Sequence, residues 1–84
     1  MTYTYTPRGV CSKKITVELS NNGVVENVSF QGGCNGNTQG VAALVKGMKA
    51  EEAISRMKGI DCNGRGTSCP DQLAEALTEA LEEL

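Results

Sequence analysis

Polar and apolar side chains alternate one by one in the N-terminal part of the chain, a pattern typical of half-buried β-strands. The stretch Thr2–Thr6 alternates threonine with tyrosine, which places Tyr3 and Tyr5 on one face. A second alternating stretch, Lys14–Ser20, follows Cys11. It turns three apolar residues to one side: Ile15, Val17 and Leu19. These patterns predict two strands that each present one face to a core.

A third strand is predicted over Val24–Phe30, with Val28 and Phe30 on its core face. The preceding pair Asn22-Gly23 is preferred in tight type I′ turns, because both residue types tolerate positive φ. Together the three stretches predict an antiparallel β-meander. Its Tyr3/Tyr5 strand would leave an edge open to pairing with a second copy, so a homo-oligomer is one expectation.

Helical spacing replaces the alternation after the glycines near position 34. Asn37 or Thr38 is predicted to cap a helix that ends at Lys46. Its inward residues would be Val41, Leu44 and Val45. A short helix is expected over Ala50–Lys58, and Gly59 ends it. Its inward residues would be Ala53, Ile54 and Met57, whereas Met48 is expected at the helix surface.

The strongest helical pattern covers Pro70–Leu84, because proline is well tolerated at a first helical position. One apolar stripe runs along it: Leu73, Ala76, Leu77, Ala80, Leu81 and Leu84. The predicted fold class is α+β, with a three-stranded antiparallel β-meander followed by two short helices and a longer C-terminal helix packed on the sheet. With 84 residues, the chain is expected to form one domain over 1–84.

Composition narrows the function. There is no Trp, and two Tyr and one Phe are the only aromatic residues, so the core is thin and a metal or disulfide staple is physically plausible. The net charge of −2 and the lack of a basic stripe argue against a nucleic-acid partner. No signal-like or membrane-length apolar run is visible, so no membrane association and a cytoplasmic location are expected.

Four cysteines carry the candidate chemistry: Cys11, Cys34, Cys62 and Cys69. In a reducing compartment they indicate metal ligands or catalytic thiols more than disulfides. The spacing lacks a tight Cys-x2-Cys knuckle, but each cysteine lies beside glycine or at the boundary of an element. Cys34 and Cys69 precede predicted helices, whose positive N-terminal ends favour thiolate.

Four thiolates suit Zn²⁺ or iron, and the chain has no histidine to contribute. Two alternatives stay open. The cysteines could be small buried apolar residues, or Cys62 and Cys69 could form a catalytic thiol–disulfide pair. Asp61 beside Cys62 is either a further ligand or a turn residue.

The stretch Thr67–Asp71 reads Thr-Ser-Cys-Pro-Asp and resembles the signature of the TSCPD domain family. The similarity extends to Gly32–Asn37, to the other cysteines and to the acidic C-terminal helix. The resemblance implies zinc binding by the cysteines. It also implies association with ribonucleoside-diphosphate reductase, an oxidoreductase of DNA synthesis, because the domain is appended to the C-terminal region of such enzymes. A chain this short cannot enclose that reaction, so the implied role is that of an accessory to a ribonucleotide reductase catalytic chain.

The layout also resembles, more distantly, the NifU-type iron–sulfur cluster scaffold. Cys11, Cys34 and Cys69 match its three cysteines, which implies iron or an iron–sulfur cluster as an alternative to zinc. Two positions depart from that family: Lys13 replaces an Asp and Ser68 replaces a His. Cys62 has no counterpart there and could complete a stable site of four sulfurs.

Overall fold

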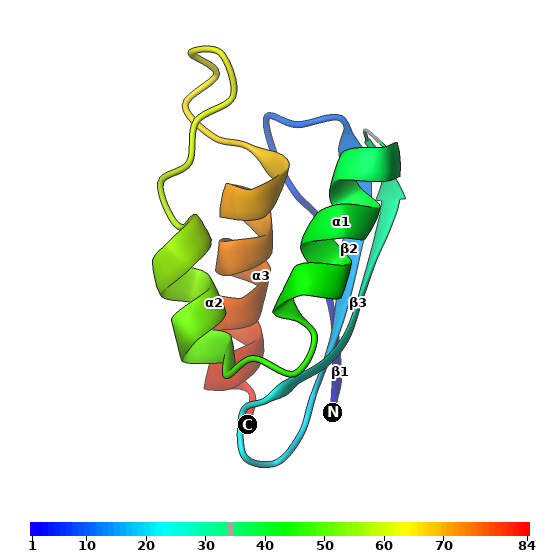
Figure 1. The fold of residues 1–84 in the computed structure, drawn as a ribbon, viewed down its shortest axis with the longest axis vertical. Helices are drawn as coiled ribbons and strands as arrows, with labels where there is room; N and C mark the ends of the chain where they lie inside the picture. Colours follow the sequence, from blue (N-terminus) through cyan, green and yellow to red (C-terminus); the bar gives the residue numbers. More distant parts are fainter. Residues whose placement is uncertain (34) are drawn as a thin grey trace.

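Three strands are followed along the chain by three helices in the computed structural model, which describes residues 1–33 and 35–84. The elements are β1 (Thr2–Tyr5), β2 (Ser12–Leu19), β3 (Val25–Gly32), α1 (Asn35–Val45), α2 (Ala50–Met57) and α3 (Cys69–Glu82) (Figure 1). The predicted α+β class is therefore confirmed.

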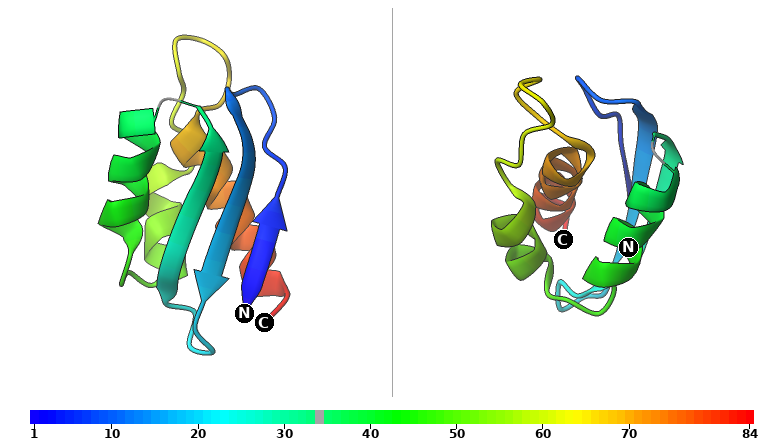
Figure 2. Two further views of the ribbon diagram at one scale, coloured as in Figure 1. Left: turned by 90° about the vertical axis from the view of Figure 1, so that its right-hand side faces the viewer. Right: turned by 45° about the horizontal axis from the view of Figure 1, so that its top comes forward.

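The strands form one antiparallel sheet in the order β1-β2-β3, and all three helices lie on the same side of it (Figure 2). Two cross-strand rows face the helices: Tyr5, Ile15 and Phe30, and next to it Tyr3, Val17 and Val28. The opposite face carries polar side chains such as Thr4 and Ser29. The period of two in the sequence thus corresponds to one covered and one uncovered face.

The connection between β2 and β3 differs from the prediction of a type I′ turn. The N–H of Gly23 donates to the carbonyl of Ser20 (3.0 Å), and only Gly23 among the turn residues has positive φ, at 77°. A register shift follows, so that Leu19 pairs with Val25. This bulge turns Val25 into the core together with Val28, although three positions separate them.

The core lies between β2 and α3. Leu73 and Leu77 of α3 are fully buried against the sheet, as are Ile15, Val17 and Leu19. Helix α2 packs on α3 on the side away from the sheet, and Met57 is 7% exposed. The predicted burial of Met57 is thus confirmed. Met48 is partly buried against the same core, so its predicted surface position was wrong.

Two apolar residues predicted to face the core do not do so. Leu44 of α1 is 78% exposed and Leu84 is 49% exposed. Leu84 lies beyond the end of α3 at Glu82. Helix α1 packs chiefly on β3, whereas α2 packs on α3, so the side of α1 that faces α2 stays uncovered. None of the described helices combines the length and the apolarity needed to cross a bilayer.

Candidate functional site

Three of the cysteines come from three separate segments and line one small pocket. Cys11 lies just before β2, Cys62 lies in the loop between α2 and α3, and Cys69 is the first residue of α3. The pocket has a volume of about 90 Å³, and its other lining residues are Val10, Asn37, Arg65, Ser68 and Pro70. Cys34 lies outside the described residues.

Cys69 is held next to a buried hydroxyl group. The Oγ atom of Ser12 lies 3.1 Å from the Sγ atom of Cys69, and Ser12 is 3% exposed. Gly33 packs against this hydroxyl so closely that a Cβ atom there would stand 2.6 Å from Oγ. Gly33 also has a φ of +86°, a backbone conformation that residues with a side chain rarely adopt. The chain segment just before position 34 therefore adjoins the residue that contacts Cys69.

Cys11 lies beside a cation. The Nη1 atom of Arg65 lies 3.9 Å from the Sγ atom of Cys11, although the two residues are 54 positions apart in the chain. Because Arg65 also lines the cysteine pocket, the site combines exposed thiols with a positive charge.

The loop that carries Cys62 is folded around Asp61. The carboxylate of Asp61 accepts hydrogen bonds from the N–H groups of Gly64 (2.6 Å) and Gly66 (2.5 Å). The N–H of Cys62 donates to the carbonyl of Thr67 (3.0 Å), which closes the loop. The structure thus shows Asp61 as a turn residue, one of the two roles considered from the sequence.

Both ends of this loop are attached to the start of α3 by Asp71. Its carboxylate accepts from the N–H of Gly59 (2.7 Å) and from the hydroxyl of Thr67 (2.5 Å). The hydroxyl of Ser68 caps the helix by accepting from the N–H of Asp71 (3.1 Å). The signature residues therefore hold Cys69 at the pocket and hold the loop of Cys62 beside it.

Gln72 was not predicted as a site residue, yet it connects the strands to the signature segment. It is 7% exposed. Its Oε1 atom accepts from the hydroxyl of Tyr5 (3.1 Å) and the N–H of Arg8 (2.9 Å), and its Nε2 atom donates to Thr67 (2.9 Å). The sequence feature that could have indicated Gln72 is its position as a polar residue directly beside the apolar stripe of the last helix.

The donor chemistry of the pocket suits a soft metal ion. Its described lining contains three thiols and no carboxylate. Among residues 1–33 and 35–84, however, no group of three or more His, Cys, Asp or Glu side chains is arranged to hold a metal ion. The described sulfurs therefore share a pocket without forming a complete ligand set.

The sequence model of the TSCPD domain matches residues 1–81 of this 84-residue chain. The chain belongs to the TSCPD domain family. This confirms the resemblance inferred from Thr67–Asp71. No curated protein and no solved structure matches the chain. In this TSCPD domain the residues that give the family its signature are those that cap α3, tie the loop to it and present Cys69.

Proposed function

We propose that this TSCPD domain binds one zinc ion through Cys11, Cys34, Cys62 and Cys69, and that it acts as an accessory domain without catalytic activity of its own. The observation that carries the proposal is the shared pocket of Cys11, Cys62 and Cys69. Two parts of the chain that are far apart in the sequence, around Cys11 and around Cys62 and Cys69, bring thiols to one place. Thiols are the ligands that structural zinc sites use most.

Cys34 is proposed as the fourth ligand because the described residues around it adjoin the pocket. Gly33 packs on Ser12, whose hydroxyl contacts Cys69, and Asn37 lines the pocket itself. Zinc–sulfur bonds of about 2.3 Å would require the sulfurs to approach one another. The loop of Cys62 is exposed, so it can adjust at little cost to the core.

The protein residues have distinct parts in this arrangement. The cysteines would bind the ion as thiolates, Ser12 would donate its hydroxyl to the sulfur of Cys69, and Arg65 would offset negative charge beside Cys11. When bound, zinc would supply a cross-link between the sheet and α3 instead of reaction chemistry. A thin core with only three aromatic residues would gain most from such a link.

Association with a ribonucleotide reductase catalytic chain is the second part of the proposal. Its support is membership of a family whose domain is appended to such enzymes, together with a size that cannot enclose a nucleotide and a radical site. The domain would therefore assist deoxyribonucleotide synthesis from the outside of the catalytic chain.

The test is metal analysis of protein purified without added metal. We expect one zinc per wild-type chain and loss of zinc in each Cys→Ser variant. Ser55→Ala, which alters an exposed hydroxyl of α2, should retain the full zinc content. A wild-type protein that is metal-free and fully folded would contradict the proposal.

A dithiol reductant is a second candidate, favoured by the observation that Cys62 and Cys69 are free thiols lining the same pocket. It predicts a reversible Cys62–Cys69 disulfide whose loss stops electron delivery to a partner reductase. If Cys62→Ser supports that partner normally, this candidate is wrong.

Transfer of an iron–sulfur cluster is less well supported than zinc retention. Ser68 stands where the scaffold resemblance would have His, and it is buried as the cap of α3. Anaerobic incubation with iron and sulfide should therefore leave a colourless, zinc-bound protein. A coloured protein that passes its cluster to an acceptor would favour the scaffold function.

A further inference from the structure

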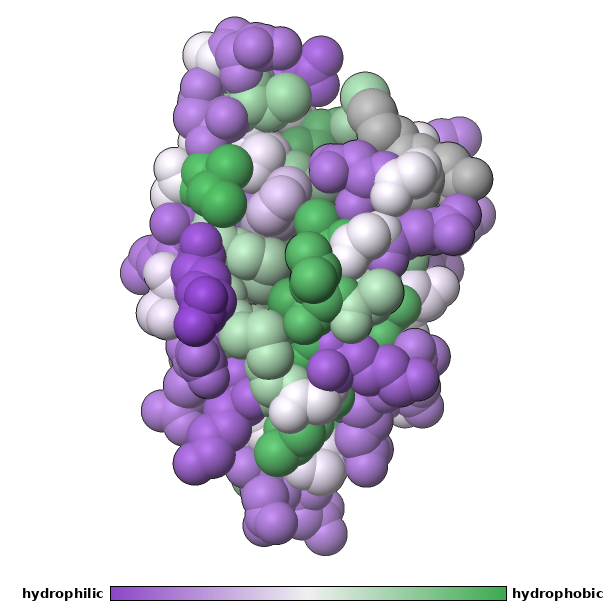
Figure 3. Space-filling model, viewed as in Figure 1, coloured by the Kyte–Doolittle hydropathy of each residue, from purple (hydrophilic) through white to green (hydrophobic). Residues whose placement is uncertain are grey.

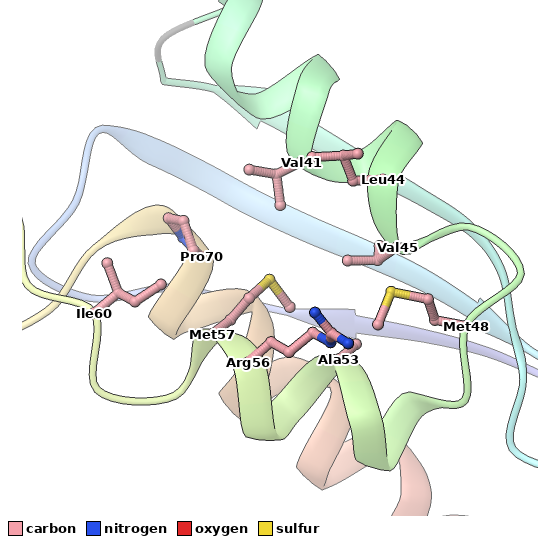
Figure 4. A pocket seen from close by; sticks show the side chains of 9 residues that line it. All are labelled: Val41, Leu44, Val45, Met48, Ala53, Arg56, Met57, Ile60 and Pro70. Atoms are coloured by element: carbon pink, nitrogen blue, oxygen red, sulfur yellow. The ribbon is translucent and has the colours of Figure 1, made fainter.

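An apolar groove lies between α1 and α2, and Pro70 at its end also lines the cysteine pocket. One wall is formed by Val41, Leu44 and Val45 of α1 and the other by Ala53, Arg56 and Met57 of α2, both with the spacing i, i+3, i+4 (Figure 4). The groove has a volume of about 380 Å³. Each helix thus turns one stripe of side chains toward the space between them.

The rim of the groove exposes large apolar side chains. Leu44 is 78% exposed and Ile60 is 44% exposed. Figure 3 shows an apolar band between α1 and α2 with hydrophilic side chains on either side of it. A helix laid along the groove would cover both the floor and the rim.

Basic residues lie in and next to the groove segments of the chain. Three lysines directly follow groove residues in the chain, namely Lys46, Lys49 and Lys58, and all three are exposed. Arg56 lies in the groove wall and forms an exposed pair with Glu52 (3.0 Å), which a stronger partner can replace. Residues 46–58 hold four cations against two carboxylates, so an acidic partner would be complementary.

A second copy of the chain does not offer such a partner among its described helices. Helix α1 contains no acidic residue. Helices α2 and α3 are acidic, but their apolar residues, such as Met57 and Leu77, are already buried in their own core. None of these described helices therefore combines acidic side chains with an apolar stripe that is free to bind the groove.

We propose that the α1–α2 groove binds an amphipathic helix of another protein, whose apolar stripe is bordered by acidic side chains. The apolar stripe would pack on Leu44, Met48 and Met57, while the acidic borders would pair with Arg56 and the neighbouring lysines. None of the groove residues contributes a thiol, although Pro70 lines both the groove and the cysteine pocket.

The test uses a synthetic helical peptide of about 18 residues, or five turns, with leucine at i, i+3, i+4 and i+7 and glutamate on both borders. A matched peptide carries lysine in place of each glutamate. In the full chain with labelled methionine methyl groups, we expect the acidic peptide to shift the signals of Met48 and Met57. The amide signals of Thr4 and Thr16, on the opposite face of the sheet, should not shift.

The acidic peptide should bind at least about tenfold more tightly than the basic one, and added salt should weaken its binding. Leu44→Asp should weaken binding by about tenfold or more without unfolding the chain, because Leu44 is 78% exposed. Arg56→Glu should remove the preference for the acidic peptide. Leu84→Asp, which changes an exposed leucine outside the groove, is the matched control.

Equal binding of the two peptides would overturn the proposal, as would unchanged binding by Leu44→Asp or an absence of shifts at Met48 and Met57. Self-association of the chain that Leu44→Asp abolishes would also overturn it, because a second copy would then cover the groove.

Discussion

Tyr3 is a single residue whose ionisation depends on one long-range contact. Its hydroxyl donates to the carboxylate of Glu79 at 2.6 Å. This hydrogen bond, together with desolvation and the nearby negative charge, raises the pKa of Tyr3 to about 12. The pKa of Tyr5 is also raised, chiefly by burial. The bond joins β1 to α3, so the titration of one phenol reports on the docking of two elements.

Glu79→Gln should therefore lower the pKa of Tyr3 toward its usual value of about 10, because a neutral amide accepts a weaker hydrogen bond than a carboxylate and does not repel phenolate. The measurement is the ultraviolet absorbance of phenolate during an alkaline titration, in a Tyr5→Phe background. A raised pKa in the folded state stabilises the fold fully below pH of about 10, and this stabilisation is lost as pH rises through about 12.

Denaturant midpoints should show the same sign, with the wild type losing more stability than Glu79→Gln across that pH window. Glu75→Gln, a change on the same helix, is the control and should leave the pKa of Tyr3 nearly unchanged. A Tyr3 titration that Glu79→Gln does not move would show that the bond is not formed in solution.

Gly33 is a second residue with a specific requirement. Gly33→Ala and Gly47→Ala both place a side chain at positive φ, +86° and +88°, but only the first meets a neighbour, Ser12 Oγ at 2.6 Å. Each substitution should destabilise the fold by about 1 kcal/mol through backbone strain. Gly33→Ala should cost about 1 kcal/mol more and displace the Ser12 hydroxyl from Cys69.

Chemical denaturation measures the difference between the two glycine variants, and the rate of Cys69 alkylation reports on the displaced hydroxyl. Equal stability and equal alkylation in Gly33→Ala and Gly47→Ala would contradict the close packing of Gly33 on Ser12.

At the scale of elements, the loop between α2 and α3 depends on Asp71. Asp71→Ala removes the acceptor of the Gly59 N–H and the Thr67 hydroxyl, and it also removes a favourable charge at the start of α3. We expect a loss of about 1–3 kcal/mol in the free energy of unfolding. Hydrogen exchange at Gly64 and Gly66 should accelerate, because the loop is then attached at fewer points.

Glu75→Ala is the matched control for Asp71→Ala. It removes an exposed carboxylate one turn further along α3 and should change stability by less than about 0.5 kcal/mol. If both variants unfold at the same denaturant concentration, Asp71 does not anchor the loop.

The strands could be predicted from the sequence because their face is set locally, by a period of two. The environment of α1 could not be predicted, because the sequence pattern of α1 does not reveal that α2 packs on α3 and not on α1. The prediction that Leu44 faces the core was wrong for that reason. The prediction of a type I′ turn at Asn22-Gly23 was wrong because a bulge, which depends on pairing between strands, replaced the simple hairpin.

The candidate site shows the same division between local and long-range information. Cys11, Cys62 and Cys69 could be named from residue type and position at element boundaries, and the structure places all three at one pocket. Gln72 could not be named, because its partners Tyr5, Arg8 and Thr67 come together only in the tertiary fold.

At the scale of the whole molecule, the fold is compact but its core contains few large side chains. The radius of gyration is 11.4 Å, close to the roughly 12 Å expected for a folded chain of this length. In the described part of the chain, five of the fourteen buried apolar core residues are alanines, which allow close packing of α2 and α3 but bury little apolar area each. Truncation of one large core side chain should therefore remove a large share of the free energy of unfolding.

In Leu77→Ala, the stability of the folded chain should depend on zinc bound at the proposed site. Leu77 is fully buried, and its truncation should cost about 2–5 kcal/mol, a large share of the roughly 4–13 kcal/mol typical of a chain this size. The expected fall in Tm is about 10 °C or more in the presence of a chelator. Zinc at a thousandfold excess over its Kd would restore about 4 kcal/mol, since it binds only the folded chain.

Calorimetry with and without zinc measures this rescue in Leu77→Ala and in the double variant Leu77→Ala with Cys69→Ser. Zinc should raise the Tm of the first protein and leave that of the second unchanged, because the second lacks a ligand. Leu84→Ala, which truncates an exposed leucine, should melt close to the wild type. A Tm that zinc raises equally in both Leu77→Ala proteins would show that the ion does not act through Cys69.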